Sequence, residues 1–405
     1  MKRYWLKLNF LFLITVALVG TIMRSVFTGM TTDLNYQFAL HTHSHTGFIG
    51  WVYQSLFFAL VTLYLPTETI RRGRYALQLG ITMALSAAMT VSFWQQGYGA
   101  ISIALSSIFQ IVSYWFVWRL WRDGKQHRET DHSYSWRFVE MALITLFVST
   151  FGPWGLAVIS ANGLQGTSLY SVAIYFYLHF QYNGWFIFGI LALFLFAVEK
   201  KSGKIEQPLA NSAFIALAVS IFPAYVLSVI YLEKTLLVYA IAILSGVTQL
   251  AGIAMLYSWL GKSNRRFSEI FPNFWSRLLV SLAGVALLLK FVFQLLSIVP
   301  GLDDIAFENR NVIIAYIHLV VLGVITFGLI GILAQQHWMN LTSKISQIGT
   351  TALIAGFVTT EYLLVSPAFG VVHIQMFTGL FYAGIAMLSG IVLVWLAQFP
   401  TARQP

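Results

Sequence analysis

Cysteine is absent from this chain of 405 residues. Its absence excludes disulfides, thiolate metal sites, iron–sulfur clusters and covalently attached c-type haem. Any metal that the chain binds must therefore be held by histidine, methionine, carboxylate or carbonyl groups.

Charged residues are scarce as well, at 9% of the chain, whereas hydrophobic residues reach 58%. Roughly a quarter of the residues of a soluble protein are charged, so this composition excludes a soluble protein of this length. Aromatic residues make up 16% of the chain, which is typical of membrane interfaces and of tight packing between helices. The composition predicts an integral membrane protein without a sizeable soluble domain.

Long apolar runs recur along the whole chain, and a helix needs roughly 20 apolar residues to cross a bilayer. The runs lie at 5–28, 41–65, 75–94, 99–120, 136–160, 170–198, 208–231, 235–260, 275–298, 311–334, 347–366 and 370–398. We expect an all-α polytopic membrane protein with about twelve transmembrane helices, in one transmembrane domain over residues 1–405. The first run is interpreted as a retained helix and not as a cleaved signal peptide.

Basic residues are divided unevenly between the two ends of these runs. If the N-terminus lies in the cytoplasm, the inner segments hold most of them and the outer loops hold only Lys234 and Arg310. The outer loops carry the acids Asp33, Glu233, Asp303, Asp304 and Glu308. This positive-inside pattern predicts a multi-pass protein of the bacterial inner membrane with both termini in the cytoplasm. The net charge of +10 is then a topology signal, and the expected partner is the lipid bilayer and not nucleic acid.

Histidines gather near one predicted membrane depth. Three of the nine, at 127, 132 and 337, fall in inner segments, where we expect ordinary solvated side chains. The other six lie on the second, sixth, tenth and twelfth runs, at His41, His43, His45, His179, His318 and His373. These four runs all pass from outside to inside, and the histidines lie at or shortly after the outer end. A single buried histidine is usually a helix–helix hydrogen bond, but six at one depth favour a shared haem or metal site.

Other polar side chains fall in the same outer half of the membrane. They are Arg24, Tyr182, Asn183, Lys290, Gln294, Glu361 and Gln375. An unpaired ionisable group is costly at this depth, so such groups normally face a bundle interior, a cofactor or a water-filled pocket. Lys290 and Glu361 could pair with each other or with cofactor propionates, and Arg24 could bind lipid headgroups instead.

The stretch from His41 to Trp51 is the most informative in the chain. On a helix His41 and His45 share one face, and His43 points nearly the opposite way. Gly47 and Gly50 remove side-chain bulk one turn deeper, where either a flat macrocycle or a closely packed helix could fit. Imidazole suits haem iron, copper and zinc alike, so these residues alone leave the metal open.

His43-Ser44-His45-Thr46-Gly47, with Gly50-Trp51, resembles a stretch of the haem–copper oxidase and nitric oxide reductase catalytic subunit. In that family two histidines on one helix bind two different haems. The segment from Tyr177 to Trp185 is similar to the family's sixth helix, where a histidine binds copper or non-haem iron. The resemblance implies an oxidase-like helical bundle, an oxidoreductase-like role in electron transport, and an electron-donor or accessory subunit as partner.

The same resemblance implies a haem ligand at His43 or His45, with His179 or His318 as its partner from another helix. Copper or another histidine-bound metal is expected at His179, with His318 and His373 as further ligands. The chain differs from the family in four places. The His-x-His stretch lies on the second run and not on the tenth, and a tyrosine follows His179 at the third position, as Tyr182, and not at the fourth. The run 208–231 has no histidine where the family has an adjacent pair, and the run 311–334 has only His318.

Three functions stay open on these grounds. The first is a haem-binding protein for redox or small-gas chemistry. The second is a transporter or metal-handling protein, in which Arg24, Lys290 and Glu361 would mark a substrate path. The third is a subunit that has kept the fold without catalysis.

The charge pattern generates a direct test of topology. Residue 163 should lie outside the cytoplasm and residue 203 inside it, because basic loops stay in the cytoplasm. Alkaline phosphatase, which is active only outside the cytoplasm, should therefore be active when fused after residue 163 and inactive when fused after residue 203. Paired alkaline phosphatase and fluorescent protein fusions measure both. Cytoplasmic placement of residue 163 would contradict the predicted orientation.

Overall fold

The computed structural model describes the chain except for residues 130–131, 206, 263–266, 300, 303–304, 306–308, 372 and 400–405. Every regular element within the described residues is a helix, so the all-α prediction is confirmed. The predicted outer acids Asp303, Asp304 and Glu308 lie outside the described residues.

Eleven helices in the described part of the chain are long and apolar enough to cross a membrane. A twelfth span is formed if the bent pair Pro208–Ser220 and Pro223–Val229 counts as one, with an angle of 54° at its break. The prediction of about twelve transmembrane helices is therefore confirmed. The continuous spans are Tyr4–Val26, Tyr36–Tyr64, Tyr75–Gln96, Ala100–Asp123, Ser133–Ala161, Ser168–Ser202, Leu236–Lys262, Phe274–Leu296, Arg310–Gln335, Lys344–Phe369 and Met376–Leu396.

The helices belong to two compact units. Unit 1 comprises Met1–Asp123, Phe271–Val280 and Leu329–Pro405, and unit 2 comprises Gly124–Ile270 and Ser281–Gly328. Helices α15 (Phe274–Leu296) and α18 (Phe327–Gln335) contribute residues to both units. The expectation of one transmembrane domain stays a prediction.

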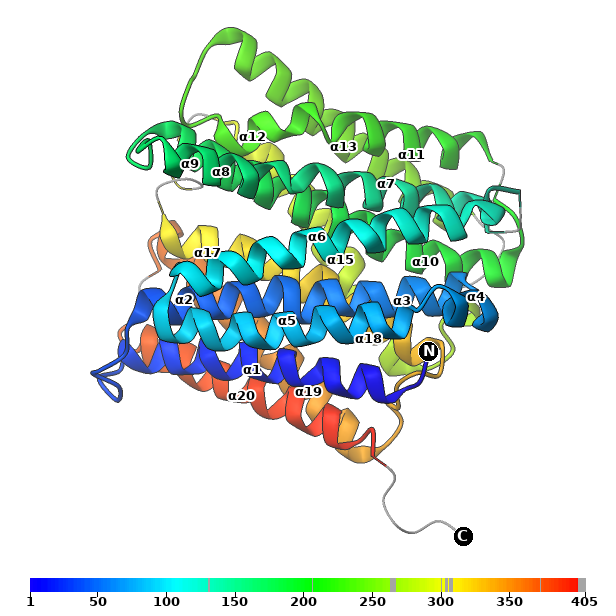
Figure 1. Ribbon diagram of the computed structural model, residues 1–405, viewed down its shortest axis with the longest axis horizontal. Helices are drawn as coiled ribbons and strands as arrows, with labels where there is room; N and C mark the ends of the chain where they lie inside the picture. Colours follow the sequence, from blue (N-terminus) through cyan, green and yellow to red (C-terminus); the bar gives the residue numbers. More distant parts are fainter. Residues whose placement is uncertain are drawn as a thin grey trace. The chain divides into compact units, whose positions relative to one another are not determined.

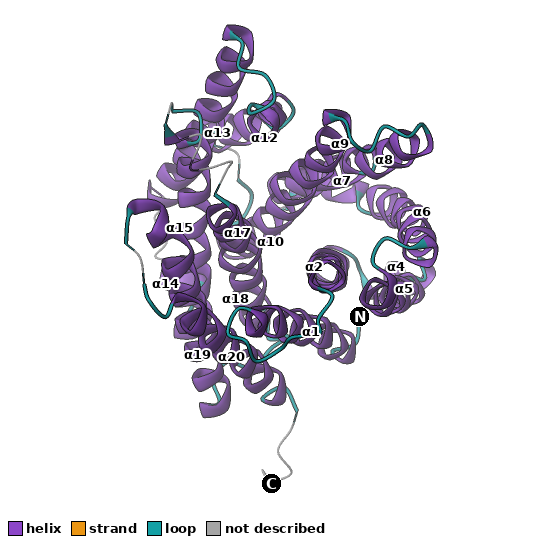
Figure 2. Ribbon diagram, turned by 90° about the vertical axis from the view of Figure 1, so that its left-hand side faces the viewer, coloured by secondary structure: helices purple, strands orange, loops and turns teal. Residues whose placement is uncertain are grey.

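Unit 1 is built on the first four spans and the last two. Its other helices are α1 (Tyr4–Val26), α2 (Tyr36–His45), η1 (Thr46–Tyr53), α3 (Gln54–Tyr64), α4 (Thr67–Arg72), α5 (Tyr75–Gln96), α6 (Ala100–Asp123), α19 (Lys344–Val365), η6 (Ser366–Phe369) and α20 (Met376–Leu396). Helix α20 packs against both α19 and α1. The three helices run alongside one another in Figure 1, and Figure 2 shows α20 between the other two. Helix α2 contacts both α1 and α5, and Figure 2 shows it end-on between them. Asn35 begins α2 by accepting a hydrogen bond from the amide of Phe38 at 3.2 Å.

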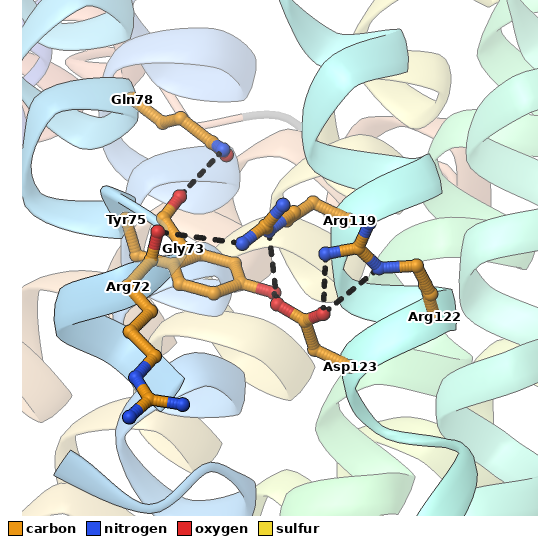
Figure 3. A network of polar contacts seen from close by, with 7 residues as sticks. All are labelled: Arg72, Gly73, Tyr75, Gln78, Arg119, Arg122 and Asp123. Carbon is orange, nitrogen blue, oxygen red and sulfur yellow. Dashed lines mark hydrogen bonds and ion pairs between the residues drawn. The ribbon is translucent and has the colours of Figure 1, made fainter. Parts of the chain in front are cut away.

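A polar network ties together the ends of α4, α5 and α6 that are predicted to face the cytoplasm (Figure 3). The carboxylate of Asp123 pairs with Arg119 at 3.0 Å and with Arg122 at 3.1 Å. It also accepts a hydrogen bond from the hydroxyl of Tyr75 at 3.1 Å. One acid thus balances a strongly basic helix end and joins α6 to α5.

Unit 2 holds the middle of the chain. Its helices are η2 (Lys125–Glu129), α7 (Ser133–Ser149), α8 (Phe151–Ala161), α9 (Ser168–Leu178), η3 (His179–Phe186), α10 (Ile187–Ser202), α11 (Pro208–Ser220), η4 (Pro223–Tyr225), α12 (Val226–Val229), α13 (Leu236–Lys262), α14 (Phe267–Ile270), α17 (Arg310–His318) and η5 (Leu319–Thr326). Helix α7 packs along α10 and η3, and α11 packs along α13.

Three spans are far more buried than the rest. The buried share of the apolar window is 83% for Tyr36–Tyr64, 89% for Ser168–Ser202 and 72% for Arg310–Gln335, against 22% to 44% for the other continuous spans. Each of these three spans contains an eight-residue π-helix, namely η1, η3 and η5. π-Helices are rare and usually short, so three in one chain form a repeated structural feature.

Glycine allows a neighbouring helix to approach two of the π-helices. A Cβ atom on Gly50 of η1 would lie 2.7 Å from Cδ1 of Phe12 in α1. A Cβ atom on Gly184 of η3 would lie 2.5 Å from the Cβ of Thr145 in α7. Both separations are closer than carbon atoms tolerate, so the two helix contacts depend on glycine.

We expect Gly50→Val and Gly184→Val each to destabilise the protein by about 1–3 kcal/mol, because the added atoms overpack a close helix contact. The matched control is Gly261→Val, at a helical glycine with no neighbouring atom within 4 Å. Denaturant unfolding in detergent, followed by circular dichroism, measures the difference. Equal stability of Gly50→Val and Gly261→Val would contradict the packing argument.

Candidate functional site

A histidine stands where each of the three π-helices begins. His45 is the last residue of α2, His179 is the first residue of η3, and His318 is the last residue of α17. In all three spans a glycine follows five residues later, at Gly50, Gly184 and Gly323. This His-x4-Gly repeat was not among the predicted motifs, although Trp51 and Trp185, each directly after its glycine, strengthen the pattern in two of the spans.

His41 and His45 share one face of α2, as predicted. The ring of His45 stacks on Phe93 with 4.1 Å between ring centroids, and its Nε2 lies 2.8 Å from the hydroxyl of Tyr98. The ring of His41 meets Tyr98 edge-on at 4.5 Å. Both histidines therefore lie against α5 and the turn that follows it.

His43 points to the opposite side of α2, towards α1, and this prediction is confirmed as well. Its Nδ1 lies 3.0 Å from the carbonyl oxygen of Val16. A carbonyl only accepts, so Nδ1 carries the proton and Nε2 carries the lone pair. Gly20 makes room for the ring, because a Cβ atom there would lie 2.9 Å from the Cε1 of His43.

The glycines after these histidines have a definite neighbour. Of the two occupants predicted for the space beside Gly47 and Gly50, the structure has the closely packed helix. Val16 of α1 would be 3.8 Å from a Cβ on Gly47, and Phe12 lies still closer to Gly50. The contact between α1 and η1 thus requires glycine at Gly50, whereas a Cβ atom on Gly47 would meet Val16 at an ordinary contact distance.

His179 is completely buried in unit 2 and joins three segments. Its Nε2 lies 2.8 Å from the carbonyl oxygen of Ile221, so Nε2 carries the proton. Its Nδ1 then accepts from the side-chain amide of Asn183 at 3.2 Å and from the hydroxyl of Ser228 at 3.4 Å. Both ring nitrogens are therefore hydrogen-bonded within the protein.

The break after α11 explains why His179 is needed there. In an α-helix the amide of Tyr225 would bond to the carbonyl of Ile221, but here it bonds to Phe222 at 3.2 Å. Pro223 opens this tighter turn, and the carbonyl of Ile221 loses its partner within the helix. A bare carbonyl is costly in a membrane, and the imidazole of His179 satisfies it.

Three other residues of unit 2 that were predicted as buried polar groups, Lys290, Gln294 and Tyr182, have neighbours other than His179. The side chain of Lys290 is completely buried, donates a hydrogen bond to Gln294, and lies 3.8 Å above the ring of Phe291. Gln294 continues the chain by donating to Gln249 at 3.0 Å. Tyr182 packs edge-on against Tyr316, with 6.4 Å between the ring centroids.

Arg24 and Glu361 lie in unit 1. The guanidinium of Arg24 donates to the carbonyl of Leu380 at 2.9 Å and to the hydroxyl of Thr360 at 3.3 Å. Arg24 therefore joins α1 to α19 and α20, which differs from the lipid-headgroup role considered for it. The proposed pairing of Glu361 with Lys290 stays a prediction.

His373 and Gln375 require a correction. The apolar run 370–398 predicts both on the twelfth helix, but α20 begins only at Met376. Gln375 is the residue that precedes the first helical turn, and His373 lies in the loop before it. The ring of His373 lies 5.2 Å from that of Tyr362 on α19.

Within the described residues no three His, Asp or Glu side chains gather in a group that could hold a metal ion. No protein-family model and no curated protein matches the chain. The predicted haem and metal ligands, and the oxidase-like arrangement of the bundle, stay predictions.

We expect His179→Ala to lower the stability of the protein by about 1–3 kcal/mol, because it leaves the Ile221 carbonyl buried without a donor. The control is His337→Asn, at an exposed histidine whose backbone has a φ of 58°. Asparagine tolerates that left-handed backbone. Thermal unfolding in detergent compares the two variants, and a His179→Ala protein as stable as the control would refute the bridging role.

Proposed function

We propose that this chain is a haem-binding integral membrane protein for redox or small-gas chemistry. The observation that carries the proposal is the histidine at the start of each π-helix in the three most buried spans. π-Helical turns are frequent at functional sites, where they re-aim side chains. Imidazole nitrogens are standard axial ligands of haem iron, and a haem held by two histidines needs no third protein ligand.

His43 has one feature that is typical of a haem ligand. A ligating imidazole normally donates its other ring N–H to a carbonyl or carboxylate, which sets the tautomer and the orientation of the ring. The bond from Nδ1 of His43 to the carbonyl of Val16 has this form, so Nε2 is the nitrogen that would bind the iron. His45 fits less well, because its Nε2 meets Tyr98 and its ring stacks on Phe93.

His179 could bind a metal only if the metal took the place of the hydrogen-bond donors at one of its ring nitrogens. Its Nε2 supports the Ile221 carbonyl, so Nδ1 is the nitrogen that could bind a metal, in place of Asn183 and Ser228. His318 is the last residue of α17, directly before its π-helix, and it belongs to unit 2 together with His179. Bound haem would supply electron transfer or gas binding, and the protein would hold and orient it.

A transporter is the second candidate, and the broken span of unit 2 favours it. Transporters often carry their substrate site where a membrane helix is interrupted. The interruption at Pro223 lies beside His179, and the buried chain Lys290–Gln294–Gln249 belongs to the same unit. These groups could bind an ion or a small polar substrate within the membrane.

The optical spectrum of the purified protein separates the two candidates. We expect an intense haem band near the violet edge that sharpens on reduction, and its loss in His43→Ala and in His318→Ala. His337→Asn is the control and should keep the band. Metal analysis of the same samples tests for copper and zinc.

Each other outcome counts against a stated part of the proposal. Haem retained in both alanine variants would refute the ligand assignment. A metal without haem, lost on the same substitutions, would indicate a metal-handling protein. Neither haem nor metal in the wild-type protein would refute the proposal and favour the transporter.

A further inference from the structure

The carboxyl group of Glu361 lies within the span Lys344–Phe369, near the end that the charge pattern predicts to face outwards. Its Oε1 is buried, and within the described part of the chain this atom has no hydrogen-bond partner. Other carboxylates of the protein are satisfied. Asp123 pairs with Arg119, and Glu199 accepts two backbone amides. Glu361 is therefore an exception that needs its own explanation.

Arg24 of α1 is the charged group that acts on this carboxyl group. The two side chains interact electrostatically, but among the described residues they do not form an ion pair. The guanidinium of Arg24 donates instead to the hydroxyl of Thr360, directly before Glu361 in the sequence, and to the carbonyl of Leu380. A positive charge is thus fixed near Glu361 without occupying its buried oxygen.

The elements packed against α19 bring few other titratable groups. Helix α20 has no charged residue and no histidine between Met376 and Leu396, and its Tyr382 is exposed. The short helix η6 has no titratable residue. His373, in the loop before α20, lies against Tyr362, the residue after Glu361. The surroundings of Glu361 are therefore mainly apolar, with Arg24 as the opposing charge.

Two opposed effects act on Glu361. An unpaired carboxylate is costly among apolar helices, because neither water nor a hydrogen-bond donor compensates its charge, and a neutral carboxyl group avoids most of this cost. The nearby guanidinium acts in the other direction, since a positive charge favours the ionised form. A carboxyl group held between such effects is suited to taking up a proton and releasing it.

We propose that Glu361 is a proton-binding site within the membrane, and that Arg24 is the positive charge that favours release of the proton. Ionisable side chains inside membrane spans are characteristic of proton relays in pumps and transporters. Binding forms one O–H bond on the carboxylate, and release returns the same proton to water or to another base. The site uses no residue proposed above as a haem ligand, so it does not depend on haem.

Dicyclohexylcarbodiimide tests the proposal, because this apolar reagent enters the bilayer and reacts with protonated carboxyl groups. The acid O–H adds across a C=N bond of the reagent, so the product keeps all atoms of both. The full-length protein in lipid vesicles is treated over a pH series, and mass spectrometry of its peptides locates the adduct. An exposed glutamate has a pKa of about 4.3 and is ionised at pH values of about 7. We expect Glu361 to be labelled there.

The label should be lost in Glu361→Gln and restored in Glu361→Asp. Infrared spectroscopy is a second measurement that needs no access for a reagent. The wild-type protein should show the C=O stretch of a protonated carboxyl group, and Glu361→Gln should lose it. Glu68→Gln is the matched control, because Glu68 is exposed and pairs with Arg71 at 2.9 Å and with Arg72 at 2.7 Å. This control should leave both signals unchanged.

Arg24 has a separate readout. Arg24→Gln should raise the pH at which half of the labelling is lost by about one unit, because the charge that favours the carboxylate is gone. Arg24→Lys keeps a positive charge and should stay nearer the wild-type value. An unchanged pH dependence in Arg24→Gln would refute the role of Arg24. Absence of both the label and the infrared band at pH values of about 7 would overturn the proton site, and this result does not require that Arg24→Gln folds.

Discussion

Inside a bilayer there is no water to satisfy a polar group that the protein leaves bare, and the architecture of this chain follows from that constraint. Helices meet it for most of the backbone. Where a helix is interrupted, side chains must replace the missing bonds, as His179 does for the carbonyl of Ile221. Buried cationic side chains also need hydrogen-bond partners within the protein. Arg24 finds a backbone carbonyl and a hydroxyl, and Lys290 finds the side-chain oxygen of Gln294.

The fold was largely predictable because membrane spans are encoded by composition over long windows. Apolar runs located the spans, and the break at Pro223 is consistent with a proline inside one of them. Two kinds of feature could not be predicted from the apolar runs. The π-helices leave no trace in hydropathy, since an extra residue in a turn changes hydrogen bonding but not composition. The start of α20 was placed too early because Val371, His373 and Ile374 belong to the apolar run without being helical.

The candidate site was predictable in its residues but not in its contacts. The opposite directions of His43 and His45 follow from α-helical spacing, and they hold because α2 remains regular up to His45. The partners of these rings come from α1 and from the turn after α5, which are distant in sequence. No local pattern announces that Tyr98 will meet His45, or that Gly20 will make room for His43. The same applies to Arg24, which acts on Glu361 from a helix near the other end of the chain.

The π-helices also bear on how such a chain can change over time. A π-turn contains one more residue than an α-turn, and one residue corresponds to a rotation of about 100° around the helix axis. The face presented by the segment after each π-helix is therefore out of phase with the face before it. A one-residue deletion that converts η1 or η3 to an α-helix would remove the wider turn at whose start His45 or His179 stands. A change of one residue in length at these places therefore exchanges one type of helix for another beside a histidine, whereas a substitution leaves the number of residues in the turn unchanged.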